Sequence, residues 1–272
     1  MIDLNSVKRT LNERLLRNGL IRRRAVSSAE VASVAADFRA ACVKTPLIRI
    51  GGDGDGGYLV PNDLAGVRHC FSPGVSVTAD FEEQIARDYG IKSFLADASV
   101  DKPPFDNPLF EFDKKFLGAC CNDKFTTLGR WVDGKLGTEP DDDLILQMDI
   151  EGAEFDVLIE SSTELLRRFR VMVIEFHSME RIFERHSLPL IKAIFAKLHR
   201  DFAIVHMHAN NCCGIAECNG MGIPRVFEVT YLRRDRLAGR VEGGAFTLPH
   251  PLDRVNVPEN ADILMPPLWW RG

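Results

Sequence analysis

The 272-residue sequence contains no apolar run near the roughly 20 residues that a membrane-spanning helix requires. Its first 24 residues also lack the apolar core of a secretory signal peptide. Acidic residues outnumber basic ones, 39 to 34, so the chain lacks the positive excess that a broad nucleic-acid surface needs. These absences predict a cytoplasmic protein with no membrane span and no nucleic-acid partner.

The cysteines lack C-x-x-C spacing. There are seven of them, an odd number, which favours reduced thiols over a disulfide framework. Cys212, Cys213 and Cys218 follow His206 and His208 closely. Structural zinc sites use two separated pairs of ligands, so the sequence leaves metal binding by this segment undecided.

Internal repeats and low-complexity tracts are absent as well, and 45% hydrophobic residues indicate a globular chain. Residues 1–48 are predicted to form an N-terminal helical cap that includes a capping box at Ser27–Glu30. Residues 49–240 form the expected α/β domain. Residues 241–272 form a proline-rich tail, which we expect to pack on that domain.

Short apolar runs that alternate with helix-length segments predict a parallel sheet with crossover helices on both faces. The last two strands are expected to be antiparallel because their link is too short for a crossover helix. The predicted strands are Val67–Phe71, Lys92–Ala96, Phe116–Cys121, Leu144–Met148, Val171–Phe176, Phe202–His208 and Arg225–Leu232. The predicted helices are Asp80–Tyr89, Ala153–Phe169 and Leu188–Arg200.

The carboxyl ends of the strands are where an open α/β sheet binds ligands. Ser72 and Gly74 follow the first strand, and Asp97 follows the second, 23 residues beyond Gly74. An acidic residue at this separation typically accepts hydrogen bonds from a nucleoside ribose. The glycine pattern G-x-G-x-x-G is absent, so a pair of ordinary turn residues is the alternative.

Asp149 and Glu151 follow the fourth predicted strand and should lie at the carboxyl edge of the sheet, and Gly152 permits a close turn into the next helix. An acid beside a nucleoside pocket is costly without a partner, so Asp149 should face a metal, a substrate hydroxyl or a cationic cofactor. Glu154 and Asp156 suit the N-terminus of that helix electrostatically.

The segment Gly51–Tyr58 is rich in glycine and aspartate. It lacks the terminal glutamate of a calcium-binding EF loop. It forms either a hairpin turn or a lid over a ligand, with Asp55 and Tyr58 as the lid residues to test.

Further along the chain, His177, His208 and Asn210 end the fifth and sixth strands and should converge on the same edge. Two mechanisms are open. A histidine acts as general base toward a hydroxyl, or a divalent ion such as Mg²⁺, Mn²⁺ or another first-row ion is held by Asp149, Glu175, His177 and His208.

Three segments resemble the FkbM-like group of class I S-adenosylmethionine-dependent methyltransferases. The most specific is LILQMDIEGAEFDVL at Leu144–Leu158, which looks like that group's strand followed by D-x-E-G-A-E. Val173–His177 resembles its next strand with a terminal E-x-H, and Cys70–Glu82 resembles a variant cofactor loop. The resemblance covers roughly residues 50–235, although the usual G-x-G is reduced to Gly74.

This resemblance implies a Rossmann-like fold, S-adenosyl-L-methionine as cofactor, and O-methylation of a hydroxyl on a sugar, glycan or small natural product. The alternatives are a noncatalytic or metal-binding module and a different nucleotide-dependent enzyme on the same fold. Trp269 and Trp270 mark either a homo-oligomer interface or a tail folded back on its own domain. The expected catalytic residues are Asp149, His177 and His208. The expected cofactor-binding residues are Asp55, Tyr58, Ser72, Gly74, Val75, Asp80, Asp97, Ala98 and Asp149.

Overall fold

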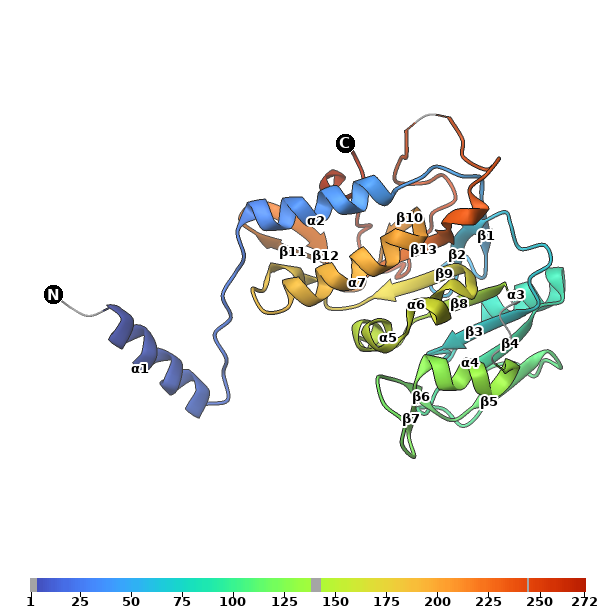
Figure 1. The fold of residues 1–272 in the computed structure, drawn as a ribbon, viewed down its shortest axis with the longest axis horizontal. Helices are drawn as coiled ribbons and strands as arrows, with labels where there is room; N and C mark the ends of the chain where they lie inside the picture. The colour runs from blue at the N-terminus through green and yellow to red at the C-terminus, as the bar shows by residue number, and fades with distance from the viewer. Residues whose placement is uncertain (1–3, 138–142, 244) are drawn as a thin grey trace.

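A seven-stranded mixed sheet organises the chain in a computed structural model, which describes residues 4–137, 143–243 and 245–272 (Figure 1). The strand order is β10-β13-β9-β8-β3-β4-β5. Only β13 runs antiparallel to its neighbours. The predicted α/β class and the antiparallel last strand are therefore confirmed. The bounds are β3 (His69–Pro73), β4 (Lys92–Ala96), β5 (Phe110–Asp113), β8 (Leu144–Met148), β9 (Phe169–Phe176), β10 (Phe202–Ala209) and β13 (Phe227–Arg233).

One predicted strand is wrong. In chain order, the third strand of the main sheet is β5, not the predicted run Phe116–Cys121. That run contributes only β6 (Phe116–Leu117), which pairs with β7 (Phe125–Thr126) outside the main sheet. As the half-exposed edge strand, β5 needs only alternating apolar residues. A search for continuous apolar runs therefore passes over it.

Helices cover one face of the sheet and share its larger core. They are α2 (Ser28–Ala41), α4 (Leu128–Leu136), α5 (Glu154–Glu160), α6 (Thr163–Arg167) and α7 (Leu188–Asp201). The predicted continuous helix 153–169 is wrong because the chain breaks at Ser161. Ser162 then caps α6 by accepting a hydrogen bond from the Leu165 N–H at 3.1 Å.

The opposite face is covered by one helix and a β-hairpin. Helix α3 (Asp80–Tyr89) packs beside β1 (Leu47–Ile50) and β2 (Tyr58–Pro61), which pair antiparallel. The predicted hairpin turn at Gly51–Tyr58 is therefore confirmed. The hairpin lies over the sheet, since the Thr230 hydroxyl of β13 donates to the Leu59 carbonyl of β2 at 2.7 Å.

The two ends of the chain behave differently. Helix α1 (Leu4–Arg17) lies apart from the body, whereas α2 begins at the predicted capping box of Ser27 and Glu30 and packs on the sheet (Figure 1). The tail folds back, and Trp269 in η3 (Pro267–Trp269) is fully buried with its indole N–H donating to the Gly222 carbonyl at 2.8 Å. In this chain the tail therefore packs on its own domain through Trp269.

The loop between β10 and β13 carries a small hairpin. It consists of β11 (Ile215–Cys218) and β12 (Met221–Pro224), which lie near the 3₁₀ turn η1 (Met179–Phe183). All seven cysteines are free thiols in this structure. No described helix is long and apolar enough to cross a membrane.

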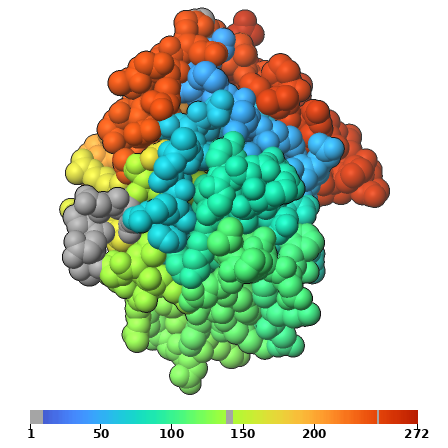
Figure 2. Space-filling view, turned by 90° about the vertical axis from the view of Figure 1, so that its right-hand side faces the viewer, coloured from blue at the N-terminus to red at the C-terminus, as the bar shows by residue number. Residues whose placement is uncertain are grey.

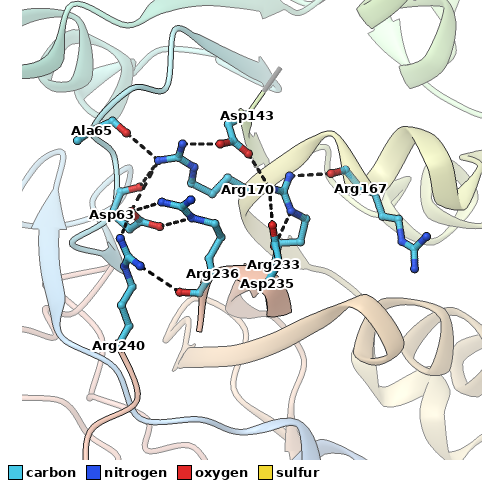
Figure 3. A network of polar contacts seen from close by, with 9 residues as sticks. All are labelled: Asp63, Ala65, Asp143, Arg167, Arg170, Arg233, Asp235, Arg236 and Arg240. Carbon is cyan, nitrogen blue, oxygen red and sulfur yellow. Dashed lines mark hydrogen bonds and ion pairs between the residues drawn. The ribbon is translucent and has the colours of Figure 1, made fainter. Parts of the chain in front are cut away.

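A buried ion-pair network links Arg236 and Arg240, which follow β13, to Asp63, which follows β2 (Figure 3). Asp63, whose side chain is 4% exposed, accepts paired hydrogen bonds from Arg236 at 2.8 Å and one from Arg240 at 2.7 Å. Arg170 donates to the Asp63 and Ala65 carbonyls. Figure 2 shows the orange and red chain after β13 against the blue and cyan hairpin region. Arg236 belongs to η2 (Arg234–Arg236).

Candidate active site

A cavity of about 490 Å³ opens at the carboxyl ends of β3, β4 and β8. This is the size range of small-molecule sites. The hairpin contributes Asp55, Gly56 and Tyr58 to its wall, so the Gly51–Tyr58 turn also lies where a lid was predicted. The β6–β7 ribbon supplies an apolar wall of Phe116, Leu117 and Phe125. The wrong strand prediction had placed Phe116 and Leu117 in the main sheet. Six acidic residues line the cavity, and among the described residues no lysine, arginine or histidine does.

The turn after β3 is held in place by backbone contacts. Gly74 has a φ of +91°, and a Cβ placed there would lie 1.5 Å from the Asp149 carbonyl oxygen. Its N–H donates to the Ala96 carbonyl at 2.9 Å. We expected this glycine to let the backbone approach a ligand. In the structure it is the turn after β8 that approaches so closely, and any side chain here would push Asp149 away from the cavity.

Asp97 lies at the predicted place and is already hydrogen-bonded. Its carboxylate accepts from the Ser76 N–H at 3.0 Å, the Ser99 N–H at 2.7 Å and the Ser99 hydroxyl at 2.6 Å. It thereby ties the turns after β3 and β4 together at the cavity wall. The turn presents Asp97 and Ser99 to the cavity, and Ala98 between them does not line it. Ala98 is therefore not a cavity residue, contrary to the prediction.

The cavity contains a buried chain of hydrogen bonds. The Ser72 hydroxyl donates to Gln147 at 2.8 Å, and the Gln147 amide donates to the Tyr58 hydroxyl at 3.1 Å. Glu82 of α3 lies beside them, 3% exposed, and burial raises its pKa to about 7 although the Ser72 hydroxyl opposes the shift. Ser72 and Tyr58 thus lie in the predicted site, while Gln147 and Glu82 were missed.

The turn after β8 has positive φ at its two central residues and is strained at the first of them, Glu151. Glu151 has a φ of +56° and Gly152 a φ of +107°, so Gly152 permits the close turn as predicted. A left-handed non-glycine residue costs of order 1–3 kcal/mol and is typical of functional sites. The Glu151 side chain is 88% exposed, and Asp149 beside it faces the cavity.

Glu154 has a larger role than the predicted helix-end charge. Its side chain is fully buried, and Oε1 accepts hydrogen bonds from the Gly152 N–H at 3.0 Å and the Ile150 N–H at 3.3 Å. The same oxygen lies 3.0 Å from His177 Nδ1. Since a carboxylate can only accept, Nδ1 carries the proton, and the other ring nitrogen, Nε2, faces the site.

Three carboxylates surround that second nitrogen. His177 Nε2 lies 3.4 Å from Glu151 Oε2, 3.6 Å from Glu175 Oε1 and 3.7 Å from Asp149 Oδ1. Burial lowers the pKa of His177, the hydrogen bond to Glu154 and the carboxylates raise it, and the net shift is upward. Burial raises the pKa of Asp149 to about 7, with His177 opposing. Burial and the charge of Asp149 raise the pKa of Glu175 well above its usual range.

His208 lies one strand further from this cluster. In the sheet register His208 pairs with Glu228, and Glu228 pairs with Glu175. His208 Nδ1 lies 3.6 Å from Glu228 Oε2, and its ring borders a second cavity of about 220 Å³ against the tail. Asn210 does reach the site, donating to Glu175 at 3.1 Å.

The predicted metal set is therefore only partly assembled. Among the described residues, one group of three has metal-ligand atoms mutually within 4.8 Å, and it consists of Asp149, Glu151 and His177. Glu175 adjoins this group, with Oε1 3.6 Å from His177 Nε2, whereas His208 lies one strand away beside Glu228. The histidines and cysteines of segment 206–218 form no such group within the described part of the chain.

Every predicted cofactor-binding residue except Ala98 lines the main cavity. The catalytic candidates Asp149 and His177 lie together, and His208 does not join them. Sequence reasoning missed Glu151 as a partner of His177 and Glu154 as its orienting group. Both belong to the D-x-E-G-A-E segment, whose dense acid content was the available signal.

This sheet, with its cavity at the carboxyl ends of the central strands, defines an α/β protein of the class I methyltransferase type. Residues 124–203 match the family model described as the methyltransferase FkbM domain. The resemblance to FkbM-like methyltransferases is thus confirmed over that stretch, which includes Asp149, Glu154 and His177 but not the turn after β3. The search of curated proteins found no match.

The solved structures that match this chain share little sequence with it. A Streptococcus thermophilus protein described as a hemolysin is 11% identical, with 79% of this chain and 69% of that one covered and a TM-score of 0.35. The precorrin-6y C5,15-methyltransferase of Geobacter metallireducens is also 11% identical, with 78% and 92% covered and a TM-score of 0.32. A human methyltransferase 10 domain containing protein is 11% identical, with 85% and 97% covered and a TM-score of 0.33.

Proposed function

We propose that this chain is an S-adenosylmethionine-dependent methyltransferase that transfers the methyl group to a hydroxyl of a sugar, glycan or small natural product. The observation that carries the proposal is the charge of the main cavity. Six acidic side chains line it, and no described basic side chain does. They are Asp55, Asp80, Glu82, Asp97, Asp149 and Glu151.

The cavity charge discriminates between nucleoside ligands. S-adenosylmethionine carries a sulfonium and an ammonium cation against one carboxylate, so its net charge is positive, and it has no phosphate. A dinucleotide would bring a pyrophosphate against carboxylates with no compensating cation, which like-charge repulsion disfavours. This argues against the alternative of a different nucleotide-dependent enzyme, together with the absent G-x-G-x-x-G.

The wall chemistry supports an orientation for the cofactor. Asp97, with Ser76 and Ser99 bound to it, offers the ribose an acceptor. The apolar wall at Phe116 and Phe125 suits the adenine ring. Asp149 then lies toward the cationic end, where its charge stabilises the sulfonium or the ammonium.

The acceptor enters beside Glu151, whose side chain is exposed at the cavity rim. Its hydroxyl oxygen attacks the methyl carbon. The O–CH₃ bond forms as the S–CH₃ bond breaks, the bonding pair passes to sulfur, and the hydroxyl proton leaves to solvent or to a carboxylate of the site. The protein's share is alignment and exclusion of water.

The noncatalytic alternative keeps the same cavity without methyl transfer. It predicts ligand binding with no labelled product from any hydroxyl-bearing acceptor. The proposal keeps a cytoplasmic location and a small-molecule or glycan acceptor, and the net charge of −5 supports the absence of a nucleic-acid partner.

The test is calorimetry with S-adenosylmethionine and S-adenosylhomocysteine, in EDTA, on wild type and Asp149→Asn. We expect the substitution to weaken S-adenosylmethionine binding about tenfold or more, since a partly buried charge pair is worth over 1.4 kcal/mol. An equal loss for S-adenosylhomocysteine places Asp149 at the ammonium that both ligands share. A smaller loss places it at the sulfonium. Unchanged affinity for both ligands would contradict the assignment of Asp149.

A further inference from the structure

We infer that Asp149, Glu151 and His177, with Glu175 behind them, form a binding site for one divalent cation of the Mn²⁺ or Mg²⁺ type at the rim of the cofactor cavity. The inference rests on the proposed function for the role of the ion, but not for its binding. It replaces the predicted ligand set, in which His208 stood where Glu151 stands.

The geometry of the group meets the requirement for a shared ion. One ligand atom from each of Asp149, Glu151 and His177 lies within 4.8 Å of the other two. Two carboxylates and one imidazole form an oxygen-rich set with a single nitrogen, which suits Mn²⁺ and also Mg²⁺. Because Glu151 is 88% exposed, solvent and an acceptor can reach the remaining coordination positions.

Glu175 gives an independent indication of a missing partner. Its side chain is 5% exposed, and its Oε2 is buried without any hydrogen-bond partner. Its Oε1 faces His177 Nε2 at 3.6 Å. Asp149 Oδ1 is likewise buried and unpartnered. Unsatisfied carboxylate oxygens in a buried position are costly, and a cation bound at Asp149 reduces that cost.

The orientation of the His177 ring also supports a bound cation. Its Nδ1–H donates to the buried Glu154 carboxylate, the arrangement that commonly orients a metal-binding histidine. Nε2 of a neutral ring would direct its lone pair at three carboxylate groups, which repel it. A positive charge at this point resolves the conflict, and it is either a proton on Nε2 or a metal ion bound to it. A protonated ring cannot act as the general base of the alternative mechanism.

No competing cation is built into the cluster. Within the described ranges, the ion pairs of Asp149, Glu151 and Glu175 all involve His177, and none involves a lysine or arginine. Glu228, the next acid in the sheet register, is paired with His208 instead. The cluster thus combines three acidic side chains with one imidazole, and no lysine or arginine of the described ranges pairs with them.

The role of such an ion follows from its position between the cofactor cavity and solvent. It would lower the pKa of an acceptor hydroxyl and orient its oxygen toward the methyl group. Asp149 borders both the ion and the cofactor, so the two sites share one residue.

The experiment measures Mn²⁺ binding directly, by the loss of the free-ion EPR signal on titrating MnCl₂ into EDTA-treated, desalted protein. We expect one site per chain, with Mg²⁺ competing for it. Glu151→Gln tests the site best because that side chain is exposed and its loss leaves the fold intact. We expect at least tenfold weaker binding for Glu151→Gln and for His177→Gln. The matched control is Asp156→Asn, an exposed acid on the next helix, which keeps wild-type affinity.

The outcomes are separable from the proposed function. Mn²⁺ that fails to bind wild type at millimolar concentration overturns the inference, as does wild-type affinity in Glu151→Gln. An equal loss in Asp156→Asn also overturns it, since it would report general surface charge. S-adenosylmethionine binding in EDTA is measured on the same protein. Cofactor binding without Mn²⁺ binding rejects only the ion site, and Mn²⁺ binding without cofactor binding rejects only the proposed function.

Discussion

Glu154→Gln tests whether the buried carboxylate positions His177. The substitution preserves shape but removes the charge that accepts from His177 Nδ1 and from the Ile150 and Gly152 N–H groups. It also places an amide N–H₂ near the backbone of His177, whose N–H already lies 3.5 Å from Oε2. We expect the imidazole to lose its fixed orientation.

The expected magnitude follows from these contacts. Hydrogen bonds to a charged group are worth about 1.5–3 kcal/mol each, and the glutamine oxygen can retain part of this. We therefore expect a loss of about 1–3 kcal/mol in the free energy of unfolding. Removing such an orienting group costs a metal site about 10–100-fold in affinity. Cofactor affinity should stay within about twofold, because Glu154 does not line the cavity.

The assays are urea unfolding, the Mn²⁺ titration by EPR and calorimetry with S-adenosylmethionine, with Asp156→Asn as the control throughout. A merely structural role for Glu154 would lower stability and leave Mn²⁺ affinity unchanged. That pattern would refute the reasoning, as would a Glu154→Gln protein with wild-type stability.

Three further predictions concern other parts of the molecule. Asp63→Asn removes the charge that pairs with Arg236, Arg240 and, at 3.7 Å, Arg170, and should cost about 2–4 kcal/mol in urea unfolding; a loss under about 0.5 kcal/mol would contradict a structural role for the network. Asp97→Ala removes the proposed ribose acceptor and the hydrogen bond from Ser76, and should weaken S-adenosylmethionine binding by about 1–3 kcal/mol in calorimetry, whereas unchanged affinity would remove Asp97 from the site. Burial lowers the pKa of His199 to about 4, below its unfolded value, so its contribution is complete above about pH 6.5 and is lost as the pH falls toward 4, by up to about 1.4 kcal/mol per pH unit. His199→Leu should flatten the pH dependence of unfolding in that window, and an unchanged slope would show that His199 is not the cause.

Local patterns predicted most of the sheet. The buried strands β4 and β8 have the predicted bounds because both faces of each are covered, so each is a nearly continuous apolar run. The edge strand β5 was missed because a half-exposed strand carries no such run. The break at Ser161 was missed because the apolar periodicity continues through it, and only the capping role of Ser162 reveals it.

The site residues were predicted from their positions at the ends of strands. The residues that this prediction misplaced or missed are explained by the sheet topology and by the turn after β8. Asp149 and His177 end adjacent parallel strands and therefore meet. His208 ends a strand that antiparallel β13 separates from β9, so Glu228 lies between it and the cluster. The inward turn of Glu154 depends on the positive φ of Glu151 and Gly152, which no periodicity shows.

The most direct test of the central claim is calorimetric titration of the wild-type protein with S-adenosylmethionine, with and without EDTA. The account predicts micromolar binding of one cofactor per chain, retained in EDTA because the cofactor cavity does not need the ion. Absence of binding under both conditions would contradict the proposal that the acidic cavity holds S-adenosylmethionine.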